Sequence, residues 1–184
     1  MTRQNSYMKS NKLLALLTGI LTTIPALAGP INDAFSTSVM GIPWGANQEQ
    51  IEAVLPNAKI QEINGYRYLE VVDGRKVFGL ERNEKNRFLF SLDSDGQFSE
   101  LQIEFPLITS VDFGERIAKL KTLFGDFIGP RDIPGGLSYE WPSEDGIKLT
   151  VRGQFGIFGM GGRTYVIVNK QLDKPRLNKA ELGL

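Results

Sequence analysis

The sequence contains no cysteine and no histidine among its 184 residues. Without a thiol or an imidazole, the chain cannot form a disulfide, a Ser-His-Asp or Cys-His nucleophilic site, or a zinc site of the usual ligand types. It also lacks the side chain that most often serves as general base near neutral pH. We therefore expect no catalytic residue, no metal ion and no cofactor, and a protein that is not an enzyme.

The sequence also has no excess of either charge, because it contains 21 basic and 21 acidic side chains. The basic residues are scattered along the sequence and form no continuous stripe. Proteins that bind nucleic acid usually carry a basic excess gathered on one surface. The composition therefore argues against nucleic acid as a partner.

The first 28 residues have the pattern of a cleavable secretory signal. Basic residues precede an apolar stretch from Leu13 to Ile24, Pro25 ends that stretch, and Ala26-Leu27-Ala28 gives the small-x-small pattern of a cleavage site. The apolar stretch is shorter than the roughly 20 residues that cross a bilayer, which disfavours a membrane anchor. Met8 is an alternative start, because the chain from Met8 onward is itself a short signal. We predict cleavage after Ala28 and a periplasmic or secreted mature protein with no transmembrane anchor.

Two helices are predicted in the mature chain. Asn47 and Gln50 have the spacing of a capping box for a short first helix. We expect Asp112 and Glu115 to cap a longer second helix, which Gly125 ends. Apolar side chains recur in the second helix at the spacing of one buried face. These side chains are Phe113, Ile117, Leu120 and Phe124.

Strands fill most of the remaining sequence. Asn64-Gly65 predicts a type I′ hairpin turn, because both central positions of that turn need positive φ. Apolar and polar residues alternate from Leu101 to Phe105, as in a sheet with one buried and one wet face. The fold class predicted is α+β, an antiparallel sheet meander with two helices packed on one face. The strands expected are 59–63, 66–72, 76–80, 87–92, 97–105, 137–141, 147–152 and 163–169.

The predicted domain, residues 29–169, has two similar halves, and a polar tail follows over residues 170–184. Residues 41–105 and 110–169 each begin with a helix and continue with a hairpin, an Asp-Gly turn and a strand. This order favours an αβββ duplication. The alternative is that antiparallel meanders in general share this turn chemistry.

Two resemblances follow from this organisation. The lead from Gly41 to Gly45, then a capped helix and a meander, resembles the small envelope domains of the SmpA-like outer-membrane-assembly family. The doubled arrangement resembles the β-lactamase inhibitor proteins, whose repeats pack helices on an antiparallel sheet. The likeness covers residues 41–80 and 112–152. The chain lacks the lipidated cysteine of the first family and the disulfides of the second. The resemblance implies a non-catalytic, protein-binding role.

A glycine-rich stretch from Gly153 to Gly162 is the first candidate surface. A dinucleotide-binding loop needs a helix after its glycines, whereas residues 163–169 are predicted to form a strand. Phe155, Phe158 and Met160 then have two interpretations. They form an exposed apolar tip that binds a partner or a lipid surface, or they pack against the core.

Four aromatic residues on the hairpins form the second candidate surface. Tyr66 and Tyr68 share one face of their strand, and Tyr139 and Trp141 share one face of theirs. Half-buried sheet packing explains these residues. The alternative is a concave aromatic face that binds a partner or a glycan.

Acidic residues give two weaker hypotheses. Asp93-Ser94-Asp95-Gly96 resembles part of a calcium loop but lacks the first aspartate and the bidentate glutamate, so we interpret it as a turn. Paired carboxylates support glycoside hydrolysis without histidine. The candidates are Glu70 with Glu140 and Glu100 with Glu104, although solvent-facing strand positions explain all four.

The leading hypothesis is an exported soluble protein that binds another envelope or secreted protein, as an accessory factor or inhibitor. The alternatives are a protein that binds a glycan or small molecule through the aromatic hairpins, and a carboxylate-based hydrolase.

Overall fold

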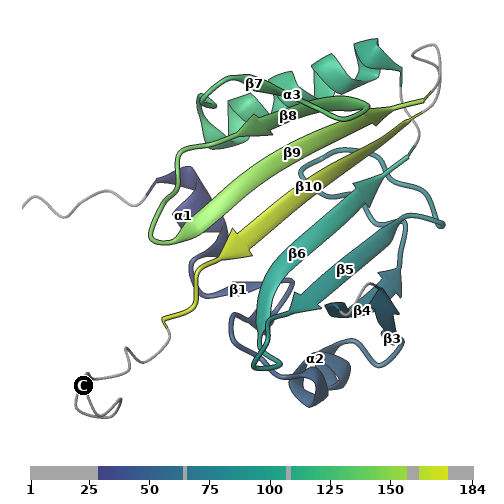
Figure 1. The fold of residues 1–184 in the computed structure, drawn as a ribbon, viewed down its shortest axis with the longest axis vertical. Helices are drawn as coiled ribbons and strands as arrows, with labels where there is room; N and C mark the ends of the chain where they lie inside the picture. Colours follow the sequence, from purple (N-terminus) through teal and green to yellow (C-terminus); the bar gives the residue numbers. More distant parts are fainter. Residues whose placement is uncertain (1–28, 64–65, 107–108, 157–161, 174–184) are drawn as a thin grey trace, which may run out of the picture.

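The computed structural model describes residues 29–63, 66–106, 109–156 and 162–173. Its main element is an eight-stranded antiparallel sheet with the strand order β3-β4-β5-β6-β10-β9-β8-β7 (Figure 1). The predicted α+β class with an antiparallel meander is therefore confirmed. The first four strands are β3 (Lys59–Ile63), β4 (Tyr66–Val72), β5 (Arg87–Leu92) and β6 (Phe98–Phe105), and the last four are β7 (Pro130–Ile133), β8 (Gly136–Glu140), β9 (Ile147–Phe155) and β10 (Gly162–Lys170).

The two meanders join at their last strands. β6 pairs with β10 in an antiparallel register that runs from Phe105 opposite Thr164 to Glu100 opposite Asn169. The short strands β3 and β7 form the two edges of the sheet. A helix precedes each meander: α2 (Gln48–Val54) comes before β3, and α3 (Ser110–Phe124) comes before β7. Each half thus contains a helix and four sheet strands, one more than the αβββ repeat predicts, whereas the expected strand list had five in the first half and three in the second. The duplication itself stays a prediction.

The expected secondary structure is wrong in two places in the sheet. Residues 76–80 form no strand, because Phe78 and Gly79 both have positive φ and make a tight turn between Val77 and Leu80. Conversely, β7 lies in a stretch that resembles a Gly/Pro-rich link. Its proline is tolerated because β7 is an edge strand, where an N–H that would point to solvent is not needed.

The helix ends show how local sequence fixes each helix. Asn47 and Gln50 form the predicted capping box of α2. In α3 the N-cap is Thr109, whose hydroxyl accepts from the Asp112 N–H while the Asp112 carboxylate accepts from the Thr109 N–H. The expected Asp112–Glu115 pair was therefore placed one turn too late. Gly125 ends α3 at φ 78°, as predicted.

A further short helix, α1 (Pro30–Phe35), lies in a segment that looks loose in sequence. Proline at the first helical position is preorganised for a helix, and Ile31 and Phe35 are both buried, one helical turn apart. The hairpin of β1 (Ser38–Val39) and β2 (Ile42–Pro43) follows it. No helix in the described residues is long and apolar enough to cross a membrane. The predicted signal, residues 1–28, lies outside the described residues.

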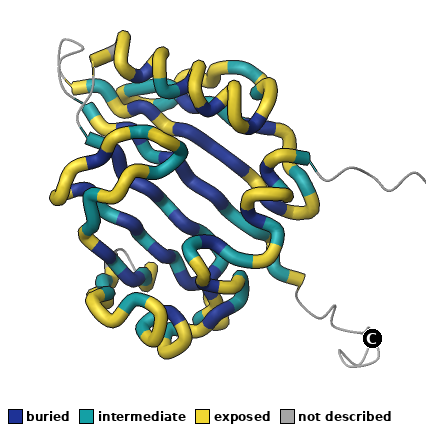
Figure 2. The backbone as a smooth tube through the Cα atoms, turned by 180° about the vertical axis from the view of Figure 1, so that it is seen from behind, coloured by how far each residue is buried: buried dark blue, intermediate teal, exposed yellow. Residues whose placement is uncertain are grey.

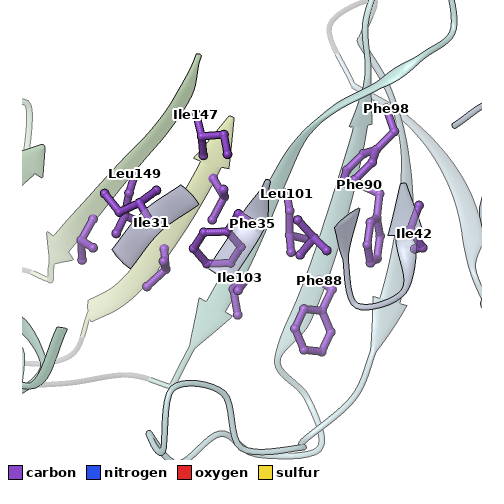
Figure 3. Packing of buried hydrophobic residues seen from close by; sticks show 14 of the residues in the cluster. Ile31, Phe35, Ile42, Phe88, Phe90, Phe98, Leu101, Ile103, Ile147 and Leu149 are labelled. Carbon is purple, nitrogen blue, oxygen red and sulfur yellow. The ribbon is translucent and has the colours of Figure 1, made fainter. Parts of the chain in front are cut away.

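The core lies between one face of the sheet and the elements that cover it. Every second side chain of β5 is buried, and the apolar core positions of β6 and β9 also lie two residues apart (Figure 3), although Glu104 and Thr150 between them are buried as well. α1, α2, α3, the β1–β2 hairpin and the loop of residues 73–86 cover this face, and buried residues of the helices and hairpin belong to the same apolar cluster. Figure 2 shows helices and loops crossing in front of the buried strands. Burying a large apolar side chain contributes roughly 1.5–3 kcal/mol, so this layer is the main source of stability.

Arg82 fixes the loop of residues 73–86 to the sheet. Arg82 is 7% exposed, and its guanidinium donates to the carbonyl oxygens of Glu104 (2.8 Å) and Arg87 (3.0 Å). It also stacks over the Phe88 ring, 3.8 Å from the ring centroid. Burial lowers the pKa of Arg82 to about 10, although the nearby charges of Asp73 and Glu104 raise it in part. Arg82 thus anchors the loop together with Phe78, whose ring packs edge-on against Phe35 and Phe124, and with Lys119, which donates to the Gly79 carbonyl at 2.7 Å.

Candidate functional site

The second face of the sheet is not covered by any described helix or loop. The apolar core cluster lies entirely on the first face, and Ile167 of β10 is the buried apolar side chain outside it. Figure 1 views this uncovered face, with the strands in front of α1. Side chains that alternate with the core positions form rows across the strands on this face. These rows are where the protein can contact a partner without rearranging its core.

One row carries three arginines and a glutamate. Opposite residues in this row are Arg87, Glu104, Tyr165, Arg152 and then Ser138 and Arg131, in the strand order from β5 to β7. Arg163 lies on the same face, two residues before Tyr165 on β10. We define the arginine patch as Arg87, Arg131, Arg152 and Arg163.

Glu104 organises one end of the arginine patch. Its side chain is 5% exposed, and its two carboxylate oxygens accept from Arg87 Nε (2.8 Å) and Arg163 Nη1 (2.7 Å). The Arg87 guanidinium also reaches Glu70, at 3.4 Å. The hydrogen bond with Glu104 raises the pKa of Arg87, so this cation stays charged at every physiological pH. Arg87 and Arg163 are therefore balanced by the two carboxylates of Glu104 and Glu70.

The other end of the arginine patch is open. Arg131 and Arg152 are exposed, and within the described part of the chain neither forms an ion pair. They lie on the same row two strands apart, at about 10 Å by strand spacing, with Ser138 between them. The four arginines of the patch face two glutamates, Glu70 and Glu104, so the positive charge in excess lies at Arg131 and Arg152, and this end of the patch attracts anionic groups.

A groove lies on the same face beside the arginine patch. Its volume is about 460 Å³, and Tyr66 is 72% exposed at its wall. We call it the tyrosine groove, and its lining includes Tyr66, Tyr68, Leu89, Gln102 and Asn169.

The other two predicted aromatic residues lie on the opposite face of the sheet. Trp141 is fully buried, and its Nε1 donates to the Gly125 carbonyl at 2.9 Å. Tyr139 packs edge-on against the rings of Phe113 and Phe127. The expected shared aromatic face therefore does not form. The hairpin registers explain why: the β3–β4 turn begins after residue 63 and the β7–β8 turn after residue 133, so Tyr139 corresponds to Leu69, a core position.

The glycine-rich stretch is only partly described. Phe155 packs edge-on against the Phe113 ring at 5.4 Å, which agrees with the expectation of packing against the core. Phe158 and Met160 lie outside the described residues, so their role in partner binding stays a prediction.

The four carboxylates considered for hydrolysis do not converge. Glu70 and Glu140 share one row but are five strand spacings apart, at about 24 Å, whereas glycosidase pairs lie within roughly 5–10 Å. Glu100 and Glu104 share a strand face but are about 13 Å apart along it. Glu140 instead faces Lys148, and Glu100 accepts from Asn169.

The residues from Asp93 to Gly96 form a turn. The Asp93 carboxylate accepts from the Asp95 and Gln97 N–H groups at 2.9 and 3.0 Å. Among the described residues, no group of three or more acidic side chains is placed to hold a metal ion.

Comparison with known proteins gives one partial likeness. A stretch of 88 residues, 48% of this chain, is 31% identical to a probable UTP–glucose-1-phosphate uridylyltransferase of Saccharomyces cerevisiae. The match covers 16% of the length of that protein. No protein-family model matches the chain, and no solved structure matches it.

Proposed function

We propose that this chain is an exported protein that binds another protein through the uncovered face of its sheet, and that it is not an enzyme. The observation that carries the proposal is the arginine patch beside the tyrosine groove on a face without a covering layer. A partner with acidic side chains opposite the patch and an aromatic or apolar side chain in the groove fits both features.

The composition of this face supports protein binding. Arginine and tyrosine are enriched at the energetically dominant centres of protein interfaces. Arg87 and Ser91 mark the patch and the groove on β5, and they are about 13 Å apart along the strand. A standard interface buries about 800 Å² on each partner, an area that spans both features. One partner therefore contacts the patch and the groove together.

Three observations favour binding over catalysis. The chain has neither histidine nor cysteine. Its candidate carboxylates are separated and engaged with basic or amide groups. The likeness to the uridylyltransferase covers about a sixth of that protein, so we do not extend its activity to this chain. The sequence of residues 1–28 supports export.

A second candidate function is binding of a glycan or small molecule in the tyrosine groove. The exposed Tyr66 ring offers an apolar surface for stacking, and Gln102 and Asn169 offer hydrogen-bonding groups beside it. The volume of about 460 Å³ lies within the usual range for ligand sites. This candidate differs from the first because it needs the groove and not the arginine patch.

The experiment compares wild type with an Arg131→Glu/Arg152→Glu double variant, a Tyr66→Ala variant and a Lys121→Glu control on α3. Proteins captured from envelope extract are identified, purified and titrated directly against each form by calorimetry. We expect the double variant to raise the dissociation constant at least tenfold at low salt. The dissociation constant of the control should stay within twofold of the wild-type value. Sequencing of the exported protein should give Gly29 as its first residue.

The proposal fails if no purified partner binds saturably, or if the double variant and the control bind equally well. A ligand that is lost with Tyr66→Ala, but retained by the double variant, would support the second candidate. Formation of labelled UDP-glucose from UTP and glucose 1-phosphate by the purified protein would contradict the proposal that the chain is not an enzyme.

A further inference from the structure

The turn between β8 and β9 contacts the first residues of the described chain. Figure 1 shows α1 beside this turn. The Glu144 carboxylate accepts from the Asn32 N–H at 2.8 Å, and the Asp145 carboxylate accepts from the Asn32 side-chain amide at 2.7 Å. Two carboxylates that lie 112 and 113 residues away in sequence therefore meet at the start of α1.

Gly29, the residue before α1, lies against the same Glu144 carboxylate. A Cβ at position 29 would stand 2.3 Å from the Glu144 Cδ and Oε1 atoms, well inside van der Waals contact. The φ of Gly29 is −73°, which every residue adopts, so the backbone conformation does not require glycine at this position. The close approach of the Glu144 carboxylate explains why residue 29 has no side chain.

This approach also limits where the Gly29 nitrogen lies. The nitrogen is bonded to the Gly29 Cα, so standard bond lengths place it within about 5 Å of the Glu144 carboxylate. In the uncut chain it is a neutral amide nitrogen. Hydrolysis after Ala28 adds the hydroxyl group of water to the Ala28 carbonyl carbon and a proton to the Gly29 nitrogen. The new carboxyl group loses a proton and the new amine gains one near neutral pH, so a cation arises within ion-pair range of Glu144.

The carboxylates of the β8–β9 turn have no cation of their own. Among the described residues, neither Glu144 nor Asp145 forms an ion pair. Glu144 is half-buried, and a partly buried charge is unfavourable unless an opposite charge pairs with it. A cation at Gly29 would supply this missing partner.

The other charged side chains on the neighbouring elements do not replace that cation. Lys148 of β9 faces Glu140, and Lys170 of β10 donates to the Ser36 carbonyl at the far end of α1. Asp33 of α1 is exposed and adds a further negative charge.

We propose that the Gly29 amino group freed by cleavage after Ala28 forms an ion pair with Glu144, so that processing of the chain fastens α1 to the β8–β9 turn. The proposal rests on the export signal of the proposed function and does not involve the arginine patch. α1 contributes Ile31 and Phe35 to the core layer, so a fixed first residue stabilises that layer in the mature protein.

The test compares two purified chains that differ only at the amino terminus. One chain contains residues 29–184, and the other contains residues 26–184, which moves the amino group about 10 Å along the chain. Both include every described residue, and both are made by removing an N-terminal tag, so neither depends on export.

Each chain is made as wild type and with two matched substitutions. Glu144→Gln removes the charge but keeps an oxygen that accepts from the Asn32 N–H. Glu140→Gln is the control, because it removes a carboxylate of β8 that faces Lys148. Gly29→Ala is a further variant of the shorter chain, and its Cβ displaces the Glu144 carboxylate.

We expect the 29–184 chain to melt roughly 1–4 °C above the 26–184 chain at low salt and neutral pH. This difference should disappear with Glu144→Gln and persist with Glu140→Gln. The melting temperature of Gly29→Ala should fall toward that of the longer chain.

The amino group itself gives a second readout. In the 29–184 chain Glu144 should raise the pKa of the Gly29 amino group above its usual value of about 8, as measured by competitive acetylation and mass spectrometry. Because this pKa is raised in the folded state, the added stability is complete below about pH 8 and is lost as the pH rises through the raised value.

Equal melting temperatures of the two wild-type chains overturn the proposal, and so does a difference that survives Glu144→Gln. An ordinary pKa at the Gly29 amino group also overturns it. Sequencing of the exported protein tests the cleavage separately, and a first residue other than Gly29 would contradict the proposed processing. The purified chains test the ion pair alone, so the two failures are distinguishable.

Discussion

Replacing Arg82 with methionine tests how the 73–86 loop is held to the sheet. Methionine keeps an unbranched apolar stem against the Phe88 ring but loses the donors to the carbonyl oxygens of Glu104 and Arg87. Short hydrogen bonds from a charged donor contribute about 1.5–3 kcal/mol each. A buried guanidinium over an aromatic ring contributes roughly 0.5–2 kcal/mol more.

The burial of the Arg82 charge opposes these gains. The fall of its pKa from 12.5 to about 10 corresponds to an unfavourable contribution of roughly 3 kcal/mol. The favourable contributions exceed this cost, and the difference lies between about 0.5 and 5 kcal/mol. We therefore expect Arg82→Met to lower the free energy of unfolding by about 2 kcal/mol.

Urea denaturation followed by tryptophan fluorescence measures this change, because Trp141 is fully buried and Trp44 stacks on Phe98 in the core layer. Limited proteolysis gives a second readout: Arg75 and Lys85 are already exposed, but trypsin cleaves after them readily only when the loop backbone is released from the sheet. Arg82→Lys should fall between wild type and Arg82→Met, because lysine keeps the charge but not the forked donors. Equal or greater stability of Arg82→Met, with unchanged proteolysis, would refute this account of the loop.

Two further predictions concern α3 and are measured by chemical and thermal denaturation. Thr109→Ala removes the N-cap and should lower the free energy of unfolding by about 1 kcal/mol. The hydrogen bonds with Thr109 lower the pKa of Asp112 below its usual 3.8, so the stabilisation by Asp112 is present above about pH 4 and is lost as the pH falls through the lowered value. Asp112→Asn should abolish that part of the pH dependence. Gly153→Ala places a Cβ 2.7 Å from the Phe113 ring and should destabilise the protein by about 1–3 kcal/mol. Gly114→Ala, in open space on α3, should stabilise it by about 0.5–1 kcal/mol. Equal effects of the two changes would contradict the packing of Phe113 against Gly153.

Local patterns in the sequence predict the elements that local physics determines. The capping box of α2, the buried face of α3 and the alternation in β6 follow from neighbouring residues, and the structure agrees with them. The failures occur where a local preference is overruled. Phe78 occupies a turn position that favours small polar residues, so residues 76–80 look like a strand.

The arginine patch was not predictable in the same way. Its members are separated widely in sequence, and Arg87 meets Arg163 on Glu104 only because β10 pairs with β6. That pairing joins residues from the two halves of the chain, and no turn or periodicity specifies it. The available signal was the alternation that places Arg152 and Arg163 at outward positions of their strands.

The two edge strands have a consequence for how molecules of this protein meet in solution. β3 has five residues and includes Lys59 and Glu62, and β7 has four residues and begins with Pro130. Short borders that carry charge or proline are poor templates for another backbone, so end-to-end growth into fibrils is disfavoured. The protein can therefore present a wide uncovered sheet face to solvent without its sheet extending from one molecule to the next.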